Sequence, residues 1–442
     1  RRGHVHAIDT ALRTLLPEAP QTEAETGLSH DLIVQLLLKT LHFSGDLSGA
    51  DCARRLGVKF SVLEPALNDI RGRRHCEVIG GGLVGASSFL YRVSEAGRAA
   101  AVAFLQHSRY VGSLPVPLSD YRRYMEGFAT VIAAPIPRAR IERAFSHLVL
   151  GDAILEELGP AINAGQSIFV YGPPGNGKTV IARAICDLMD GEMAIPHALF
   201  VEGAIIRVFD PAMHEPLPDD FSLDTGLEST DQYDHRWARC RRPRIVTGGE
   251  LVLQSLELSY GAGVYRAPIQ VMANGGVLVV DDFGRQRCSP RDLLDRWMVP
   301  LEDRVDYLTL QSGLRIEVPF VTMIVFATNL RPADLVEEAF LRRVQFKVSA
   351  GDPTAADFTR IFERCCADRN LPFDAWIVTD LFDRWYRPRG LPMRACHPRD
   401  LINQALLIAD YLEQPRALTP KLLEKACLAY FVIDREPQRP PS

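Results

Sequence analysis

The residues best suited to chemistry form a glycine-rich loop that ends in a lysine and a threonine. They are Gly172, Pro173, Pro174, Gly175, Asn176, Gly177, Lys178 and Thr179. Glycines let a backbone wrap closely around phosphate oxygens, and the N–H groups of the loop and of a following helix supply partial positive charge. The lysine ammonium would reach the terminal phosphates, and the threonine hydroxyl would bind Mg²⁺. With Val180 opening the helix, the loop is predicted to bind a nucleoside triphosphate.

Two carboxylates follow a second apolar segment. Val277–Val280 is continuously apolar and precedes Asp281 and Asp282, a pattern that fits a parallel strand covered on both faces. At the carboxyl end of such a strand, Asp281 is placed to hold Mg²⁺ through water, and Asp282 to polarise the attacking water. An aspartate that only caps a helix is the alternative. The phosphate loop upstream favours the catalytic reading.

A third group of polar side chains comes later in the chain. Asn329 ends a strand that begins at Val321 and could orient the lytic water or sense the γ-phosphate. Arg342 and Arg343 end the next helix. A paired arginine there ordinarily compensates the helix dipole, but this order of elements favours an arginine that acts on a neighbouring subunit's nucleotide. Arg399 begins a later helix and could reach the phosphates; an exposed N-terminal arginine is its alternative.

The elements that position these residues are predicted to form several domains. The loop lies between a strand at 167–171 and a helix from 180. Residues 28–109 show three helical patterns, a hairpin and a closing helix, which indicates a winged helix-turn-helix. Its third helix carries Glu64 and Asp69, which would face DNA phosphates badly. Arg71, Arg73 and Arg74 at the end of that helix could touch a DNA backbone. Protein docking is favoured over DNA contact, and both stay open.

The rest of the chain is divided by composition. The expected segments are a lead-in at 1–27, a proline-punctuated linker at 110–140, a nucleotide-binding core at 141–350, a helical lid at 351–435 and a tail at 436–442. The core is expected to carry an insertion at about 205–270. Tyr260–Tyr265 within it reads either as a flexible loop that grips a polymer or as an ordinary turn.

Composition limits the partners and the cellular compartment that can be expected for this protein. The 442 residues are 47% hydrophobic and 24% charged, with a net charge of −5. The net charge therefore does not indicate nucleic acid or an anionic membrane as a partner. No apolar run approaches the roughly 20 residues of a membrane span, and the N-terminus lacks the apolar stretch of a signal peptide. The nine scattered cysteines argue against a disulfide framework or zinc site. A cytoplasmic protein without a membrane partner is expected.

Together these residues resemble the AAA+ ATPase superfamily. Gly172–Thr179 matches its Walker A motif, Val277–Asp282 Walker B, Asn329 sensor 1, Arg342 and Arg343 the arginine-finger region, and Arg399 sensor 2. The resemblance covers about 140–435. The segment before Asp281 is similar to the clade that contains MoxR-type, Mg-chelatase-like and sigma-54-activator ATPases. The segment around Arg343 is similar to the MoxR-type finger segment, which favours Arg343 as the finger. The whole chain is similar to poorly characterised bacterial AAA+ proteins with N-terminal winged helices.

The resemblance implies an α/β fold, with a parallel five-stranded sheet in the order 5-1-4-3-2, a C-terminal helical lid and an N-terminal winged helix. It implies ATP and Mg²⁺ as ligands and a homo-oligomeric ring, most often a hexamer, that remodels an unidentified protein. Asp282 stands where most members have Glu, so slow hydrolysis is predicted. The alternatives are a DNA-binding regulator switched by ATP through residues 28–109, and a nucleotide-gated scaffold with very slow hydrolysis.

Overall fold

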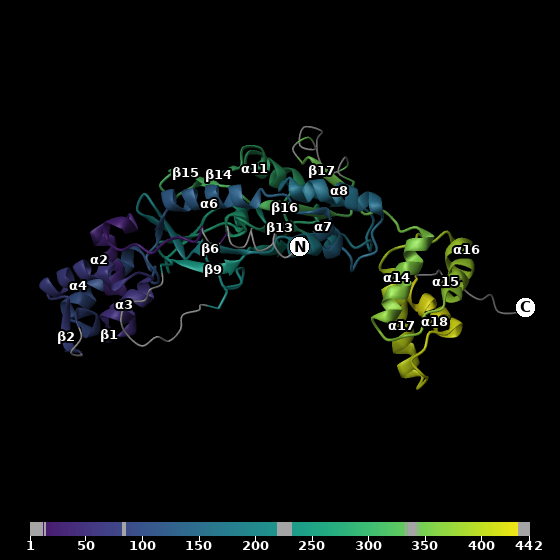
Figure 1. Ribbon diagram of the computed structural model, residues 1–442, viewed down its shortest axis with the longest axis horizontal. Coiled ribbons are helices and arrows are strands. Elements are labelled where there is room, and N and C mark those ends of the chain that lie inside the picture. Colours follow the sequence, from purple (N-terminus) through teal and green to yellow (C-terminus); the bar gives the residue numbers. More distant parts are fainter. Residues whose placement is uncertain are drawn as a thin grey trace, which may run out of the picture.

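At the centre of the protein lies a five-stranded parallel sheet (Figure 1). The computed structural model describes residues 12, 15–81, 85–218, 232–331, 334, 342 and 344–431. The strands are β5 (Ile168–Tyr171), β10 (Arg244–Thr247), β13 (Val277–Val280), β16 (Met323–Thr328) and β17 (Phe346–Ser349). They pair in parallel in the order β17-β5-β16-β13-β10. Numbered along the chain from β5, that order is 5-1-4-3-2.

Helices cover both faces of this sheet, which is why its inner strands are continuously apolar. One face packs on α7 (Arg138–Ala144), α8 (Asp152–Asn163) and α9 (Lys178–Leu188), and the other on α6 (Leu118–Ile132) and α11 (Pro290–Asp303). Side chains alternate between the two layers with the period of two that a strand imposes. Along β13, Val277 and Val279 belong to the first layer, and Leu278 and Val280 to the second.

Smaller sheets extend the core on the side of α6. One has the order β11-β12-β8-β7-β4, a second pairs β6 with β9, and a third is the β14–β15 hairpin. These elements are β4 (Val116–Pro117), β6 (Glu192–Pro196), β7 (Ala198–Val201), β8 (Ala204–Arg207), β9 (Trp237–Arg241), η3 (Leu253–Leu256), β11 (Ser259–Gly261), β12 (Val264–Arg266), α10 (Ile269–Met272), β14 (Val305–Thr309) and β15 (Arg315–Pro319).

Two expected boundaries need correction. The insertion at about 205–270 is not continuous, because β10 within it is a strand of the central sheet and pairs in parallel with β13. The linker at 110–140 is a built-in part of the core rather than a tether. Val116 of β4 and Phe128 of α6 are fully buried in the same apolar cluster as the inner strands. Burial of apolar side chains from this stretch outweighs the extended tendency of its prolines.

The N-terminal domain has the expected helices and hairpin. Its elements are η1 (Ala24–Thr26), α2 (His30–Ser44), β1 (Leu47–Ser48), α3 (Gly49–Leu56), α4 (Phe60–Gly72), β2 (Cys76–Gly81), η2 (Ala86–Ser88), β3 (Phe89–Val93) and α5 (Glu95–His107). Serine side chains cap α2, α3 and α5 by accepting from backbone N–H groups. The three strands form an antiparallel sheet in the order β1-β3-β2. Ala198 and Ile205 of the neighbouring sheet belong to this domain's apolar cluster, so the two units share one core.

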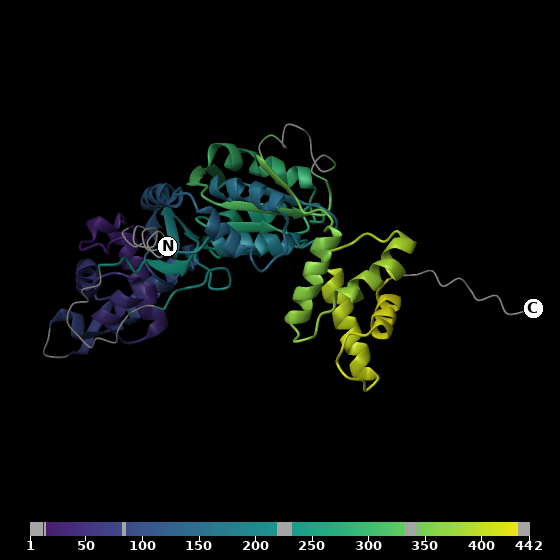
Figure 2. The ribbon, with the colours of Figure 1, turned by 45° about the vertical axis from the view of Figure 1, so that its right-hand side comes forward.

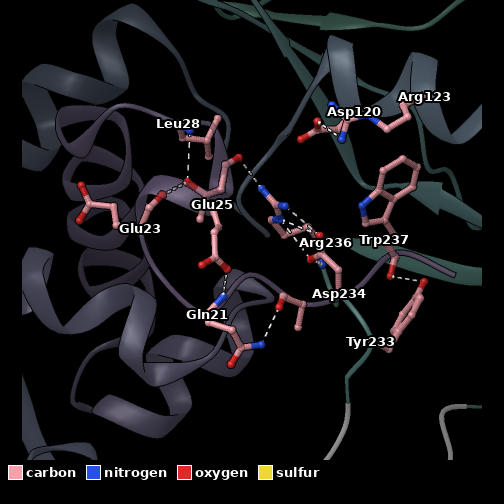
Figure 3. A network of polar contacts seen from close by, with 12 residues as sticks. Gln21, Glu23, Glu25, Leu28, Asp120, Arg123, Tyr233, Asp234, Arg236 and Trp237 are labelled. Carbon is pink, nitrogen blue, oxygen red and sulfur yellow. Dashed lines mark hydrogen bonds and ion pairs between the residues drawn. The ribbon is translucent and has the colours of Figure 1, made fainter.

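A buried ion pair closes the same junction (Figure 3). Arg236 and Asp234 are only 4% and 2% exposed, and their charged groups lie 2.8 Å apart. Arg236 Nη1 also donates to the carbonyl of Thr26, 2.9 Å away, at the end of η1. Gly57, after α3, lies so close to His235 that a Cβ on it would sit 2.6 Å from the His235 carbonyl oxygen. The N-terminal domain is therefore fixed to the core by polar and apolar contacts together.

The Tyr260–Tyr265 segment is the ordinary turn rather than the gripping loop. Ala262 and Gly263 both have positive φ, 55° and 74°, as a two-residue hairpin turn between β11 and β12 requires. The Arg109 N–H donates to the Ala262 carbonyl at 3.0 Å. A Cβ on Gly263 would lie 2.1 Å from the His107 carbonyl oxygen. The tip of the hairpin is thus docked against the end of α5.

The C-terminal domain consists of helices around a core of their own. They are α14 (Ala355–Ala367), α15 (Ala375–Leu381), the π-helical turn η4 (Phe382–Tyr386), α16 (Arg387–Arg389), α17 (His397–Tyr411) and α18 (Pro420–Tyr430). This part of the chain is therefore helical, as the sequence predicts. Figures 1 and 2 show this domain and the N-terminal one at opposite ends of the core. Among the described residues, no helix has the length and apolar character needed to cross a bilayer.

Candidate functional site

The phosphate loop joins β5 to α9 at the carboxyl edge of the central sheet. The Gly172 N–H donates to the Thr328 carbonyl of β16, 3.2 Å away. Gly172 has a φ of 149°, and a Cβ on it would lie 2.2 Å from the Ala350 carbonyl oxygen just after β17. A side chain cannot be accommodated at this point. The two strands that flank β5 therefore hold the start of the loop in place.

Lys178 is the first residue of α9 and lies within the loop. Its side chain is buried, and Nζ donates to the Pro173 carbonyl at 2.8 Å. Burial lowers the pKa of the Lys178 ammonium, while the charges of Asp282 and Asp281 oppose that shift.

Thr179 and Asp281 bring the phosphate loop and the end of β13 together. Thr179 Oγ1 lies 2.9 Å and 3.1 Å from the two carboxylate oxygens of Asp281. A hydroxyl and a carboxylate oxygen at one point fit Mg²⁺, which typically takes one or two protein ligands and completes its shell with water and phosphate oxygens. Within the described ranges, no cluster of three or more His, Cys, Asp or Glu side chains forms another metal site.

Asp282 and Asn329 meet beside this pair. Asn329 Nδ2 donates to Asp282 Oδ1 at 3.2 Å, across the ends of β16 and β13. The Asp282 N–H donates to Asp281 Oδ1 at 3.0 Å. Asp282 has a φ of 48°, in the left-handed region that aspartate tolerates better than most residues. The arrangement places one carboxylate and one amide where an attacking water could be held.

Further residues, which sequence reasoning missed, shape the turn after β13. Gln286 Nε2 donates to the carbonyls of Asp281 and Asp282, at 3.1 Å and 3.2 Å. Thr328 Oγ1, fully buried, donates to the Phe283 carbonyl at 2.7 Å. A polar residue shortly after the Asp-Asp pair is the only sequence signal for Gln286. Both side chains fix the backbone that carries the two carboxylates.

The arginines expected at the site are placed unequally. Arg399 lies in the first turn of α17 and is 59% exposed, and its Nε pairs with the adjacent Asp400 at 2.9 Å. That hydrogen bond raises the pKa of Arg399. Arg342 is exposed, and Arg343 lies outside the described residues. Arg394, which sequence reasoning missed, lies against the loop, because a Cβ on Gly175 would be 3.6 Å from Arg394 Cβ. Its guanidinium pairs with Asp352, which also accepts from Asn176. Val180 on α9 is 39% exposed.

The fold and site together define an α/β protein with a P-loop at the edge of a parallel sheet. A domain of unknown function (DUF8689) matches residues 354–429, which cover α14 to α18 except the last residue. Over 49 residues, 11% of the chain, the sequence is 45% identical to a vesicle-fusing ATPase of Dictyostelium discoideum. That match spans 6% of the ATPase.

The matches to solved structures have lower sequence identity. The RuvB Holliday junction branch migration motor of Thermotoga maritima is 14% identical, with a TM-score of 0.35, over 63% of this chain and 68% of that one. NtrX from Brucella abortus, in complex with ATP, is 12% identical, with a TM-score of 0.37, over 61% of this chain and 54% of that one.

Proposed function

We propose that this protein is a Mg²⁺-dependent AAA+ ATPase that hydrolyses ATP to ADP and phosphate. The observation that carries the proposal is the convergence of Lys178, Thr179, Asp281, Asp282 and Asn329 at one edge of the sheet. A solitary glycine loop would support nucleotide binding alone. A loop that touches the end of β13, which in turn touches the end of β16, supports hydrolysis as well.

Each side chain would have a distinct part in the reaction. Lys178 and the loop N–H groups would bind the phosphates, and Thr179 with Asp281 would hold Mg²⁺, which offsets phosphate charge when bound. Asp282 would accept the proton of the attacking water, held in line by Asn329. Asp282 has one methylene less than the usual glutamate, so its carboxylate reaches less far and turnover is expected to be slow.

The same proposal includes assembly of the protein into a ring and the remodelling of a partner by that ring. Arg343 of a neighbouring copy would stabilise charge on the transferring phosphate, with Arg342 beside it, so the complete site would need a homo-oligomer, most simply a hexamer. The strand order 5-1-4-3-2 and the separate C-terminal domain, which would serve as the lid, support this class. Remodelling of a protein partner would follow from nucleotide-driven movement of the lid against the core.

The N-terminal domain, which we assign as a winged helix, is proposed to dock protein rather than DNA. Polar groups near both ends of α4 make hydrogen bonds within the chain. Lys59 and Ser61 at its start donate to Gln21 at 3.0 Å and 2.8 Å. Asp69 near its end contacts His30 and Arg73. A helix whose first turn is covered in this way is poorly placed to enter a major groove.

Nucleotide binding and phosphate release by purified protein test the proposal. Wild type should bind a fluorescent ATP analogue with Mg²⁺ and release phosphate, whereas Lys178→Ala should lose binding and Asp282→Asn should bind without turnover. Lys421→Ala, which removes an exposed lysine of α18, is the matched control for lost charge. Wild-type protein that binds no ATP would refute the proposal.

The same preparation separates the alternatives. Salt-dependent binding of duplex DNA, lost when Arg71, Arg73 and Arg74 are replaced by Ala, would favour the DNA-binding regulator. ATP binding without measurable phosphate release would favour the nucleotide-gated scaffold. Material captured by Asp282→Asn with ATP, analysed for both protein and nucleic acid, would identify the substrate class.

A further inference from the structure

The C-terminal domain touches the phosphate loop through one short segment between α16 and α17. The Cys396 N–H donates to the Gly175 carbonyl at 2.9 Å. Gly175 has a φ of 86°, and a Cβ on it would lie 2.6 Å from Cys396 Sγ and 3.6 Å from Arg394 Cβ. The segment therefore lies directly against the loop. A side chain at Gly175 would push it away.

Asn176 makes this contact specific through both ends of its amide. Its Oδ1 accepts from the Ala395 N–H at 3.1 Å, and its Nδ2 donates to Asp352 Oδ1 at 2.7 Å. Asn176 is only 6% exposed. Its amide thus bonds at once to the C-terminal domain and to the connection between β17 and α14. A buried amide held at both ends fixes the relative position of the groups it joins.

Arg394 completes the cluster with a charge. Its guanidinium pairs with the same oxygen of Asp352 that accepts from Asn176. The side chain of Arg394 is 21% exposed and that of Asp352 40% exposed. The cluster adjoins the proposed nucleotide site, because a Cβ on Gly175 would lie 3.6 Å from Arg394 Cβ, and the Arg394 charge helps to lower the pKa of the Lys178 ammonium.

We propose that Asn176, Asp352 and Arg394 form a latch that holds the C-terminal domain against the phosphate loop and sets how fast nucleotide leaves. The inference rests on the proposed function for its ligand, ATP or ADP, but not for the contact itself. Asn176 acts here as a positioning residue: it holds the Arg394–Cys396 segment and the Asp352 carboxylate beside the loop. Breaking the latch should free the domain to swing without unfolding it, because the domain has its own apolar core.

Hydrogen exchange of the nucleotide-free protein tests the contact. Asn176→Ala and Asp352→Ala should each speed exchange of the Ala395 and Cys396 amides, and the double variant should add little, because both substitutions break one cluster. Asp410→Ala is the control, since it removes an exposed carboxylate that pairs with Arg416 in the same domain. Unchanged exchange in Asn176→Ala would overturn the latch. This outcome requires no ATP binding.

Nucleotide release tests the function of the latch. Displacement of a fluorescent ADP analogue should be about tenfold faster in Asn176→Ala, Asp352→Ala and Arg394→Gln, the order expected for one lost hydrogen bond to a charged group. Arg394→Lys keeps the charge and should release the analogue more slowly than Arg394→Gln. The thermal unfolding midpoints of all these variants should differ little from that of wild type. Wild type that binds no nucleotide would refute the ATPase proposal. Wild type that binds it and releases it no more slowly than the variants would refute the latch alone.

Discussion

At the scale of single residues, the candidate site is organised by short polar contacts between elements. Thr179 holds Asp281, and Asn329 holds Asp282. Such contacts reduce the reorganisation that a reaction would otherwise require. Asp282 stands out because its backbone is left-handed, with a φ of 48°. This conformation suits aspartate and asparagine better than glutamate, because their short side chains bond locally.

Replacement of Asp282 by Glu should therefore have two opposed effects. The longer carboxylate should raise phosphate release, while the left-handed backbone should cost about 1 kcal/mol of unfolding free energy. Steady-state phosphate release and urea unfolding measure the two. Asp282→Asn is the control, because it keeps the backbone preference and should lose turnover without the stability cost. Ordinary wild-type turnover, abolished equally by Ala and Asn and not raised by Glu, would contradict the predicted slow hydrolysis.

At the scale of elements, α17 joins the latch segment to the core of the C-terminal domain. His397 at its start is 7% exposed, and its Nδ1 lies 2.8 Å from the Tyr386 hydroxyl. It is therefore a buried residue of the first helical turn. Burial, aided by the charge of Arg394, lowers the pKa of the His397 imidazole from 6.5 to about 4. Protonation of the His397 imidazole would bury a charge, so it opposes the packing of α17 that orients the Arg394–Cys396 segment.

Acid should accordingly weaken the C-terminal domain. Between pH 6.5 and 4, His397 is protonated in the unfolded chain but neutral in the folded chain. The unfolding free energy should therefore fall by about 3 kcal/mol as the pH drops through that window, and the full stability should be present above pH 6.5. His397→Gln, which keeps a polar partner for Tyr386, should flatten this dependence. Urea unfolding of both proteins at matched pH, followed by tryptophan fluorescence, measures the difference. Parallel curves for the two proteins would contradict the assignment.

At the scale of the whole molecule, the two ends of the chain are attached differently. The N-terminal domain shares an apolar cluster with the neighbouring sheet, and its Thr26 carbonyl accepts from Arg236, which forms a buried ion pair with Asp234 just before β9. The C-terminal domain has a separate core and meets the phosphate loop through polar contacts. The N-terminal domain is thus expected to follow the core as one body, while the C-terminal domain moves.

Arg236 and Asp234 should stabilise the N-terminal junction only when both charged groups are present. Arg236→Met leaves the Asp234 carboxylate buried without its partner and should cost about 3–5 kcal/mol. The double variant Asp234→Asn with Arg236→Met removes that charge and should recover most of the loss. Urea midpoints, with hydrogen exchange of residues 15–26 as a local readout, give the comparison. A double variant as unstable as the single one would show that hydrogen bonds to the backbone, rather than the charge pair, dominate.

Assembly provides the prediction for the proposed ring. Asp282→Asn with ATP and Mg²⁺ should sediment as a larger, hexamer-sized particle than the same protein without nucleotide. Arg343→Ala should bind ATP yet lose turnover, because the finger acts across subunits. Arg342→Ala is the neighbouring control and should keep most activity. Retained phosphate release by an assembled Arg343→Ala protein would refute the finger assignment.

The sequence by itself determined the features whose residues lie close together along the chain. The phosphate loop and the apolar strand before Asp281 follow from local chemistry, since one glycine pattern or one continuous apolar run specifies each. That Thr179 would meet Asp281 could also be expected, because the carboxyl ends of parallel strands share one edge of a sheet. The four helices of the C-terminal domain were likewise predictable from their periodicity.

Only the tertiary structure decided which distant residues meet. Asn176 and Asp352 are 176 residues apart, and Asn176 and Ala395 are 219 apart, so no local pattern connects them. The same holds for β10, which lies within a stretch that reads as an insertion yet pairs with β13. Arg399 fits its motif but pairs with Asp400, while Arg394 fits none and lies at the loop. Local sequence selects side chains that could bind phosphate, whereas the packing of separate elements places Arg394 beside the phosphate loop.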